Sequence, residues 1–152
     1  MKYTPNKKDI NFIGIANVVK NLSKDKRTQI GAVIIGEDKQ IISTGYNSFP
    51  RGIDDEVEER NVSPEKYFWI SHAEVNAICN AALSGVSTKN SSIYLTCGTP
   101  CTTCCAAIIN SGIKKVFCSS DFKAFSNSVW EDEHFPRSMK MLSEAGIEVN
   151  FY

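Results

Sequence analysis

One histidine and two cysteines, spaced to reach a single metal ion, constrain the fold of this chain more than any other feature. His72-Ala73-Glu74 stands well before Pro100-Cys101-Thr102-Thr103-Cys104 in the sequence. Three protein ligands of this kind leave the fourth tetrahedral position of zinc open for water, which is typical of a catalytic zinc site. Glu74 is placed to move protons to and from that water. The fold must therefore bring two separate segments to one ion.

Each half of this pattern also has a simpler interpretation. Ser71-x-x-Glu74 fits a capping box, in which Glu74 only returns a hydrogen bond to the backbone of Ser71. Cys101-x-x-Cys104 alone has the spacing of a thioredoxin-like redox pair. A redox pair would leave His72 without a role. The two halves together favour a metal site with Glu74 as its proton carrier.

Size and charge limit the class of protein. The 152 residues fit one domain over residues 1–152. Lys+Arg and Asp+Glu both number 17, and this balance disfavours a protein that grips long nucleic acid. No apolar run approaches the roughly 18–20 residues of a membrane span, and residues 1–9 lack the apolar stretch of a signal peptide. We expect a cytoplasmic protein with a small-molecule substrate and no nucleic-acid or membrane partner.

The six cysteines are expected to be thiols and metal ligands rather than disulfides, because the chain shows no export signal. Cys79, Cys97 and Cys118 lie in apolar segments and are expected in the core. Cys105 is expected to point away from the metal if its segment is helical. His134 stands among acidic residues, in a segment expected at the surface, and we do not count it as a ligand.

Hydrophobic periodicity predicts alternating helices and strands. Helices are expected over residues 9–23, 72–84 after an N-cap at Ser71, 100–109 after an N-cap at Thr99, and 136–145. Strands are expected over residues 29–35, 40–44, 92–97, 113–118 and 147–151, and residues 45–70 form a long functional or mobile loop. These elements predict a three-layer α/β/α sandwich with a central mixed five-stranded sheet, antiparallel in its first hairpin and parallel later.

The expected positions suit hydrolytic chemistry. Both motifs would begin helices at the edge of the sheet where ligands usually bind. Cys101 and Cys104 would share a helix face, and the helix N-terminus favours their thiolate forms. Zinc lowers the pKa of bound water from about 15.7 to roughly 7. Glu74 can then carry protons to a ring nitrogen and a leaving amine, which predicts deamination at an amidine carbon such as C4 of cytosine.

At these residues the chain resembles the cytidine and deoxycytidylate deaminase superfamily, whose zinc motifs have this form. The resemblance runs over about residues 22–152 and is strongest to deoxycytidylate (dCMP) deaminases. It is carried by residues 26–34, 64–67, 71–78 and 112–116, and by Gly45-Tyr46-Asn47-Ser48-Phe49-Pro50-Arg51-Gly52. The last of these stretches indicates nucleoside monophosphates as substrates.

The resemblance implies a role for each matching residue. His72, Cys101 and Cys104 correspond to the zinc ligands, and Glu74 to the proton shuttle. Asn47, Arg27 and Ala73 correspond to substrate-binding residues, with Arg27 as the candidate for the phosphate or, alternatively, a solvated charge. Tyr67, Trp69 and Phe122 either cover the base or belong to the core. The implied reaction converts dCMP to dUMP and ammonia, which feeds dTTP synthesis.

The same resemblance implies regulation and assembly. Gly45, Tyr46, Asn47, Ser48 and Arg51 correspond to a site for dCTP and dTTP effectors, which bind with Mg²⁺. Members of the family commonly carry Gly-Tyr-Asn-Gly, where this chain has Ser48. A positive φ at that position would be harder for serine than for glycine. The family also tends to form homo-oligomers, often hexamers.

Four alternatives remain at this point. A sister deaminase would act on another small base, nucleoside or nucleotide. An RNA-editing adenosine deaminase shares the zinc motifs, but the neutral charge and the 45–52 stretch disfavour it. A non-catalytic zinc domain would have no need of Glu74 beside an open ligand position. A thiol redox protein would contain no metal, and a metal assay distinguishes it.

Overall fold

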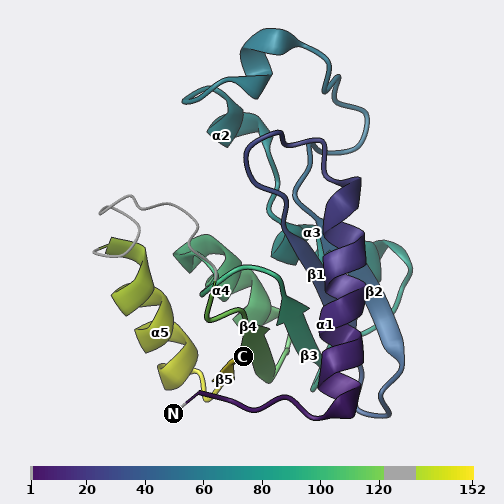
Figure 1. Cartoon of the computed structure of the whole chain (residues 1–152), viewed down its shortest axis with the longest axis vertical. Coiled ribbons are helices and arrows are strands. Elements are labelled where there is room, and N and C mark those ends of the chain that lie inside the picture. Colours follow the sequence, from purple (N-terminus) through teal and green to yellow (C-terminus); the bar gives the residue numbers. More distant parts are fainter. Residues whose placement is uncertain (1, 122–132) are drawn as a thin grey trace.

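The computed structural model describes residues 2–121 and 133–152, which form one mixed sheet between helices (Figure 1). The helices are α1 (Lys7–Val19), α2 (Lys66–Trp69), α3 (Ala73–Leu83), α4 (Thr102–Asn110) and α5 (Phe135–Glu144), with short 3₁₀ turns η1 (Lys20–Leu22) and η2 (Glu58–Asn61). The strands are β1 (Gly31–Ile35), β2 (Ile41–Tyr46), β3 (Ser92–Leu95), β4 (Lys115–Cys118) and β5 (Glu148–Phe151). No helix in the described part of the chain is long and apolar enough to cross a membrane.

The predicted five-stranded mixed sheet is confirmed. Its strand order is β2-β1-β3-β4-β5. β1 pairs antiparallel with both β2 and β3, whereas β3, β4 and β5 run parallel. The hairpin between β1 and β2 turns through Gly36–Lys39, where Lys39 takes a φ of 66°. The parallel strands are joined through helices, as parallel pairs require.

Alternation along β1 assigns its side chains to two cores and so confirms the three layers. Ala32 and Ile34 point to one face, and Val33 and Ile35 to the other, because successive side chains of a strand alternate. The first core includes residues of α3, α4 and α5: Ala73, Ala77, Cys105, Ile108 and Leu142. The second core is covered by α1 and contains Ala16, Tyr94 and Phe117.

Close contact between α3 and β2 fixes the helix that carries His72. A Cβ added at Gly45 would collide with the backbone of Ala73 and Ala77, so only glycine allows this approach. Asn76 and Asn80 then donate side-chain hydrogen bonds to carbonyl oxygens of β2, at 2.7 and 2.6 Å. These bonds set both the distance and the rotation of α3 on the sheet.

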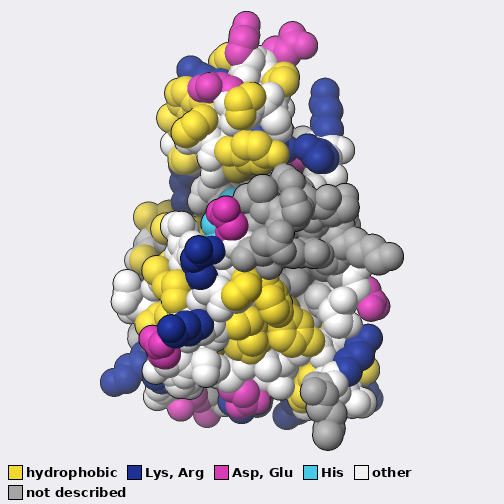
Figure 2. Space-filling view, turned by 90° about the vertical axis from the view of Figure 1, so that its left-hand side faces the viewer, with side chains coloured by type: hydrophobic (Ala, Val, Ile, Leu, Met, Phe, Trp, Pro, Cys, Tyr) yellow, Lys and Arg dark blue, Asp and Glu magenta, His cyan; other side chains and the backbone are white. Residues whose placement is uncertain are grey.

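The predicted 45–70 loop starts two residues too early, because Gly45 and Tyr46 complete β2, and the rest of it contains two helical turns, η2 and α2. It stands as a lobe at one end of the molecule, and hydrophobic side chains gather on its surface (Figures 1 and 2). Phe68 is 82% exposed there. A largely buried ion pair of 2.9 Å between Lys66 Nζ and Asp25 Oδ2 ties the lobe to the body of the protein.

A buried carboxylate on the opposite face of the sheet joins α1 to β3. α1 begins at Lys7, slightly earlier than predicted, because Asn6 and Asp9 form a capping box. Asp9 also accepts hydrogen bonds from the hydroxyls of Tyr3 (2.6 Å) and Tyr94 (2.7 Å). Burial acts to raise the pKa of Asp9, but the bonds from Tyr3, Tyr94 and the backbone N–H of Asn6, with the charge of Lys39, leave the pKa below its ordinary value.

Replacing this carboxylate should destabilise the fold in a pH-dependent way. Because the folded-state pKa of Asp9 is lowered, its stabilisation is fully present above the ordinary value of 3.8 and is lost as the pH falls through the folded pKa. We expect Asp9→Asn to lower the free energy of unfolding by roughly 1–3 kcal/mol near neutral pH. Urea unfolding at neutral and acidic pH measures this, with the exposed Glu37→Gln as control. A deficit that stays constant down to acidic pH would contradict the role of the charge.

Candidate metal centre

Two helix starts carry the metal-binding motifs, and both begin later than predicted. The N-cap of α3 is His72 and not Ser71, and the N-cap of α4 is Cys101 and not Thr99. Ser71 is held in an extended conformation by Ser48, with backbone hydrogen bonds of 2.8 and 3.1 Å in both directions. The helix therefore starts only after this bridge.

These boundaries also decide the alternative role of Glu74. In a capping box its carboxylate would accept a hydrogen bond from the backbone N–H of Ser71. That N–H instead donates to the carbonyl of Ser48, and no side-chain bond caps α3. The capping-box interpretation is therefore wrong.

At the second helix start, a metal-binding side chain is itself the cap. Cys101 Sγ accepts a hydrogen bond from the backbone N–H of Cys104 at 3.4 Å. Pro100 is thereby excluded from the helix and lies in the buried segment that leads into it. The hydroxyl of Thr99, which was predicted to cap, is buried without a partner among the described residues.

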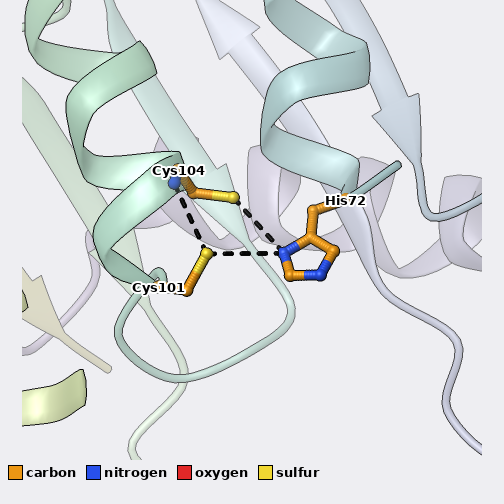
Figure 3. Close-up of side chains that lie close together, drawn as sticks. All are labelled: His72, Cys101 and Cys104. Atoms are coloured by element: carbon orange, nitrogen blue, oxygen red, sulfur yellow. Dashed lines mark hydrogen bonds between the residues drawn. The ribbon is translucent and has the colours of Figure 1, made fainter. Parts of the chain in front are cut away.

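The three predicted ligand atoms converge (Figure 3). His72 Nδ1 lies 3.6 Å from Cys101 Sγ and 3.4 Å from Cys104 Sγ, and the three atoms all lie within 4.8 Å of one another. Zinc bonds of about 2.3 Å to sulfur and 2.0–2.1 Å to nitrogen, set at the tetrahedral angle, separate S and N by about 3.6 Å. Both sulfur–nitrogen distances therefore fit zinc. His134, at the start of α5, is not part of this group.

Hydrogen bonds between the ligands distribute their protons unequally. The bond from Cys104, aided by His72, lowers the pKa of Cys101 to about 4 despite burial. The same bond raises the pKa of Cys104, because its proton is shared with the neighbouring thiolate. The bond to Cys101 raises the pKa of His72 to about 8. A metal ion would replace the protons that Cys104 and His72 hold, and would bind Cys101 as the thiolate that it already is.

Glu74 lies in the first turn of α3 and is only 3% exposed. Burial raises the pKa of its carboxyl, although the charge of His72 acts in the opposite direction. Cys97 Sγ lies 3.9 Å from Glu74 Oε1 and donates to it. Ala73, between the histidine and the acid, is fully buried in the core. The site thus combines three ligands with a buried acid that is not among them.

Two predicted substrate residues lie in the turn before β1 and just after β2. The amide of Asn47 joins the two segments, because its Oδ1 accepts from the N–H of Ile30 and its Nδ2 donates to the carbonyl of Thr28, both at 2.8 Å. Arg27 is exposed, and its backbone N–H donates to Asp25. The contacts of Asn47 and Arg27 with a nucleotide stay predictions.

A cleft of about 1260 Å³ opens between the 45–70 lobe and the body, and its lining reaches Ser71 but includes none of the three candidate ligands. It is lined by Asn47, by Ser71 next to His72, and by charged side chains of both signs. The basic residues are Lys24, Lys26, Arg27, Arg51 and Lys66, and the acidic ones are Asp25, Asp55, Glu56 and Glu58. A ligand with phosphate groups would find cations on both walls.

The residues predicted to bind effectors separate into two groups. Gly45 is explained by the packing of α3, whereas Tyr46, Asn47, Ser48 and Arg51 line the cleft. Arg51 donates to Asn80 Oδ1. Ser48 does not take a positive φ, and its hydroxyl accepts a bond from Asn76 at 3.2 Å. The expected strain of serine at this position is therefore wrong.

All six cysteines are free, as expected, but they differ in position. Cys97 and Cys118 are buried as predicted, whereas Cys79 is exposed on the outer side of α3. Cys105 points away from the ligands into the core, and its thiol donates to the carbonyl of Pro100 at 3.5 Å. Cys105 thus supports the segment that precedes Cys101. The sequence around Cys105 did not predict its hydrogen bond to the carbonyl of Pro100.

Of the three predicted aromatic residues, the two that the structure describes, Tyr67 and Trp69, do not belong to the core. Tyr67 is 53% exposed. Trp69 is half-buried within the lobe, where its Nε1 donates to Glu65 and the Arg60 guanidinium lies 4.2 Å above its ring. Phe122 lies outside the described residues. Whether Tyr67 or Trp69 covers a substrate base stays a prediction.

Comparison with known proteins gives a consistent family. A family model described as the cytidine and deoxycytidylate deaminase zinc-binding region matches residues 6–120. A Caenorhabditis elegans protein named "Probable deoxycytidylate deaminase" is 39% identical over 114 residues, which are 73% of this chain but only 56% of that protein. An uncharacterized deaminase of Aliivibrio fischeri is 38% identical over 92% of this chain and 90% of its own length.

The fold has a solved counterpart. The crystal structure of the dCMP deaminase of cyanophage S-TIM5, in complex with dCMP and dUMP, superposes with a TM-score of 0.76. Its sequence is 24% identical, and the match covers 99% of this chain and 100% of that one. This likeness confirms the predicted α/β fold.

Metal analysis of purified variants tests the ligand set. We expect about one zinc per chain in the wild type, and little in Cys101→Ala or Cys104→Ala, because two ligands do not hold the ion tightly. Cys79→Ala is the matched control and should keep its zinc, since that thiol is exposed and outside the group. Glu74→Gln should also keep it. Zinc retained in both Cys101→Ala and Cys104→Ala would contradict the assignment.

Proposed function

The chain belongs to the cytidine and deoxycytidylate deaminase family, and from this premise we propose that it hydrolyses dCMP to dUMP and ammonia, a step toward dTTP. The observation that carries the proposal is a buried acid, Glu74, beside three convergent zinc ligands. A structural zinc site needs no such acid. The names of the relatives and the charged cleft beside the site support a nucleotide as the substrate.

The residues of the chain divide the work of hydrolysis. Zinc, held by His72, Cys101 and Cys104, would activate a water molecule for attack on C4 of cytosine. Glu74 accepts the proton that the water loses and passes it to the ring nitrogen next to C4. It then carries the second proton of the water to the amine, and the C4–N bond breaks to release ammonia. The raised pKa of the buried Glu74 suits a group that both accepts and donates protons.

Binding of the nucleotide falls to residues of the cleft. We assign the phosphate to Arg27, because it is exposed at the cleft and a guanidinium grips phosphate oxygens bidentately. Asn47 keeps one N–H and one oxygen lone pair after its two backbone bonds, so it can still meet the nucleoside. Ala73 is fully buried between His72 and Glu74, so its side chain offers no accessible surface to the nucleotide in this conformation.

An ammonia-release screen tests the substrate class. We expect dCMP to be turned over far faster than deoxycytidine, cytidine, CMP, cytosine or adenosine. Arg27→Ala should reduce turnover of dCMP much more than residual turnover of deoxycytidine, because only dCMP carries the phosphate. Glu74→Gln should lose roughly 10²–10⁴-fold in rate while keeping zinc.

Other outcomes of the screen identify other functions. Preference for another base, nucleoside or nucleotide would make the chain a sister deaminase. Equal losses on both substrates in Arg27→Ala would remove Arg27 from the phosphate site. Full activity without metal would exclude the mechanism.

We further propose control by nucleoside triphosphates with Mg²⁺, dCTP activating and dTTP inhibiting, in a homo-oligomer that we take to be a hexamer. The family resemblance at residues 45–52 supports this, as does the position of Tyr46, Ser48 and Arg51 in the cleft. Serine at position 48 is unstrained and offers a hydroxyl to the ligand. An effector can shift activity only if its affinity differs between two states of the protein.

Saturation curves for dCMP decide this point. With Mg²⁺ present, dCTP should lower the half-saturating concentration and dTTP should raise it. Light scattering of the same samples measures the oligomer. Three superimposed curves would mean that the 45–52 segment has no regulatory role.

A further inference from the structure

We propose that Cys97 is a positioning residue, whose thiol holds the carboxylate of Glu74 in place for proton transfer. Cys97 follows β3 at the edge of the sheet where the metal ligands lie, and its Sγ is 3.9 Å from Glu74 Oε1. This inference rests on the proposed hydrolytic function of the site. It adds a residue that neither binds the metal nor belongs to the matched motifs.

The contact between Cys97 and Glu74 matters because both side chains are buried. Glu74 is 3% exposed and Cys97 is 6% exposed, so water gives the carboxylate little solvation. A buried carboxylate needs hydrogen-bond donors, and Cys97 supplies one from outside the ligand set. Burial also raises the pKa of Cys97 well above its usual value, which keeps the thiol protonated and able to donate.

The backbone around Cys97 fixes the position of the donor. The carbonyl of Cys97 accepts the N–H of Ser119, just after β4, at 2.8 Å. The preceding residue, Thr96, is bonded to Gly31 in both directions, through its N–H at 3.0 Å and through its hydroxyl at 2.9 Å. The thiol is therefore held by β1 and β4, and not by the helix that carries Glu74.

A thiol suits a base of this kind better than a stronger partner would. A lysine or arginine beside Glu74 would favour its ionised form and weaken it as a proton acceptor. An S–H group is a weak donor and leaves most of the basicity in place. It contacts and orients Oε1 of the carboxylate.

Kinetics of matched cysteine variants test the proposal, with whichever substrate the enzyme turns over. Cys97→Ala should lower kcat about 5–15-fold, the equivalent of one hydrogen bond, while KM and zinc content stay at wild-type values. Cys97→Ser restores a donor and should recover most of the loss. Cys118→Ala is the control, because Cys118 is also a buried thiol of the core, and its kcat should stay within about twofold.

A second test uses infrared spectroscopy and needs no turnover. The S–H stretching band of Cys97 in the zinc-loaded enzyme is identified by its loss in Cys97→Ala. In Glu74→Gln the band should move to higher frequency, because an amide oxygen is a weaker acceptor than a carboxylate.

A third test compares double and single variants by their activity. Cys97→Ala should cost little further activity when added to Glu74→Gln, since the two residues act as one unit.

Clear results would overturn the proposal. An equal loss of kcat in Cys97→Ala and Cys118→Ala would make Cys97 a packing residue only, and so would an S–H band unmoved by Glu74→Gln. An enzyme that prefers another substrate would change the proposed function but would leave the infrared result valid. The two failures are therefore distinguishable.

Discussion

The packing of α3 against β2 is the contact on which the rest of the site depends. Gly45 lets the helix backbone rest on the strand, and the two asparagines of α3 bond to carbonyls of that strand. A helix held so closely has one position and one rotation. His72 therefore faces the start of α4, and Glu74 turns into the interior. A small shift of α3 would separate the histidine from the sulfur ligands without altering any ligand.

The cysteines in and around the candidate metal centre differ in protonation, and the surroundings of each thiol determine its pKa. Cys101 and Cys104 stand at a helix N-terminus beside a histidine, and there the thiolate of Cys101 is stabilised while Cys104 keeps the proton that the two sulfurs share. Cys105 and Cys118 lie in the apolar core, where burial raises the pKa of each thiol and keeps it neutral. The protein thus obtains metal ligands and neutral donors from one residue type.

The sequence predicted the layers, the hairpin, the parallel strands and the convergence of His72, Cys101 and Cys104, because these follow from local periodicity and spacing. It failed where a distant residue decides the outcome. Serine is favoured at helix N-caps, yet the bridge to Ser48 holds Ser71 in an extended conformation. The error at Cys79 was avoidable, because Ala73, Ala77 and Ala81 already mark the inner face of α3 at helical spacing. The contact of Cys97 with Glu74 depends on the tertiary fold and has no local signal.

The exposed position of Cys79 gives the molecule a practical property. Cys79 is exposed at the wall of the cleft, whereas the other five thiols are buried. A maleimide dye would therefore attach at one position of the natural chain, with no engineered residue and no loss of a metal ligand. Its fluorescence would respond to changes in polarity within the cleft. The protein thus carries its own attachment point for an optical probe of whether the cleft is occupied.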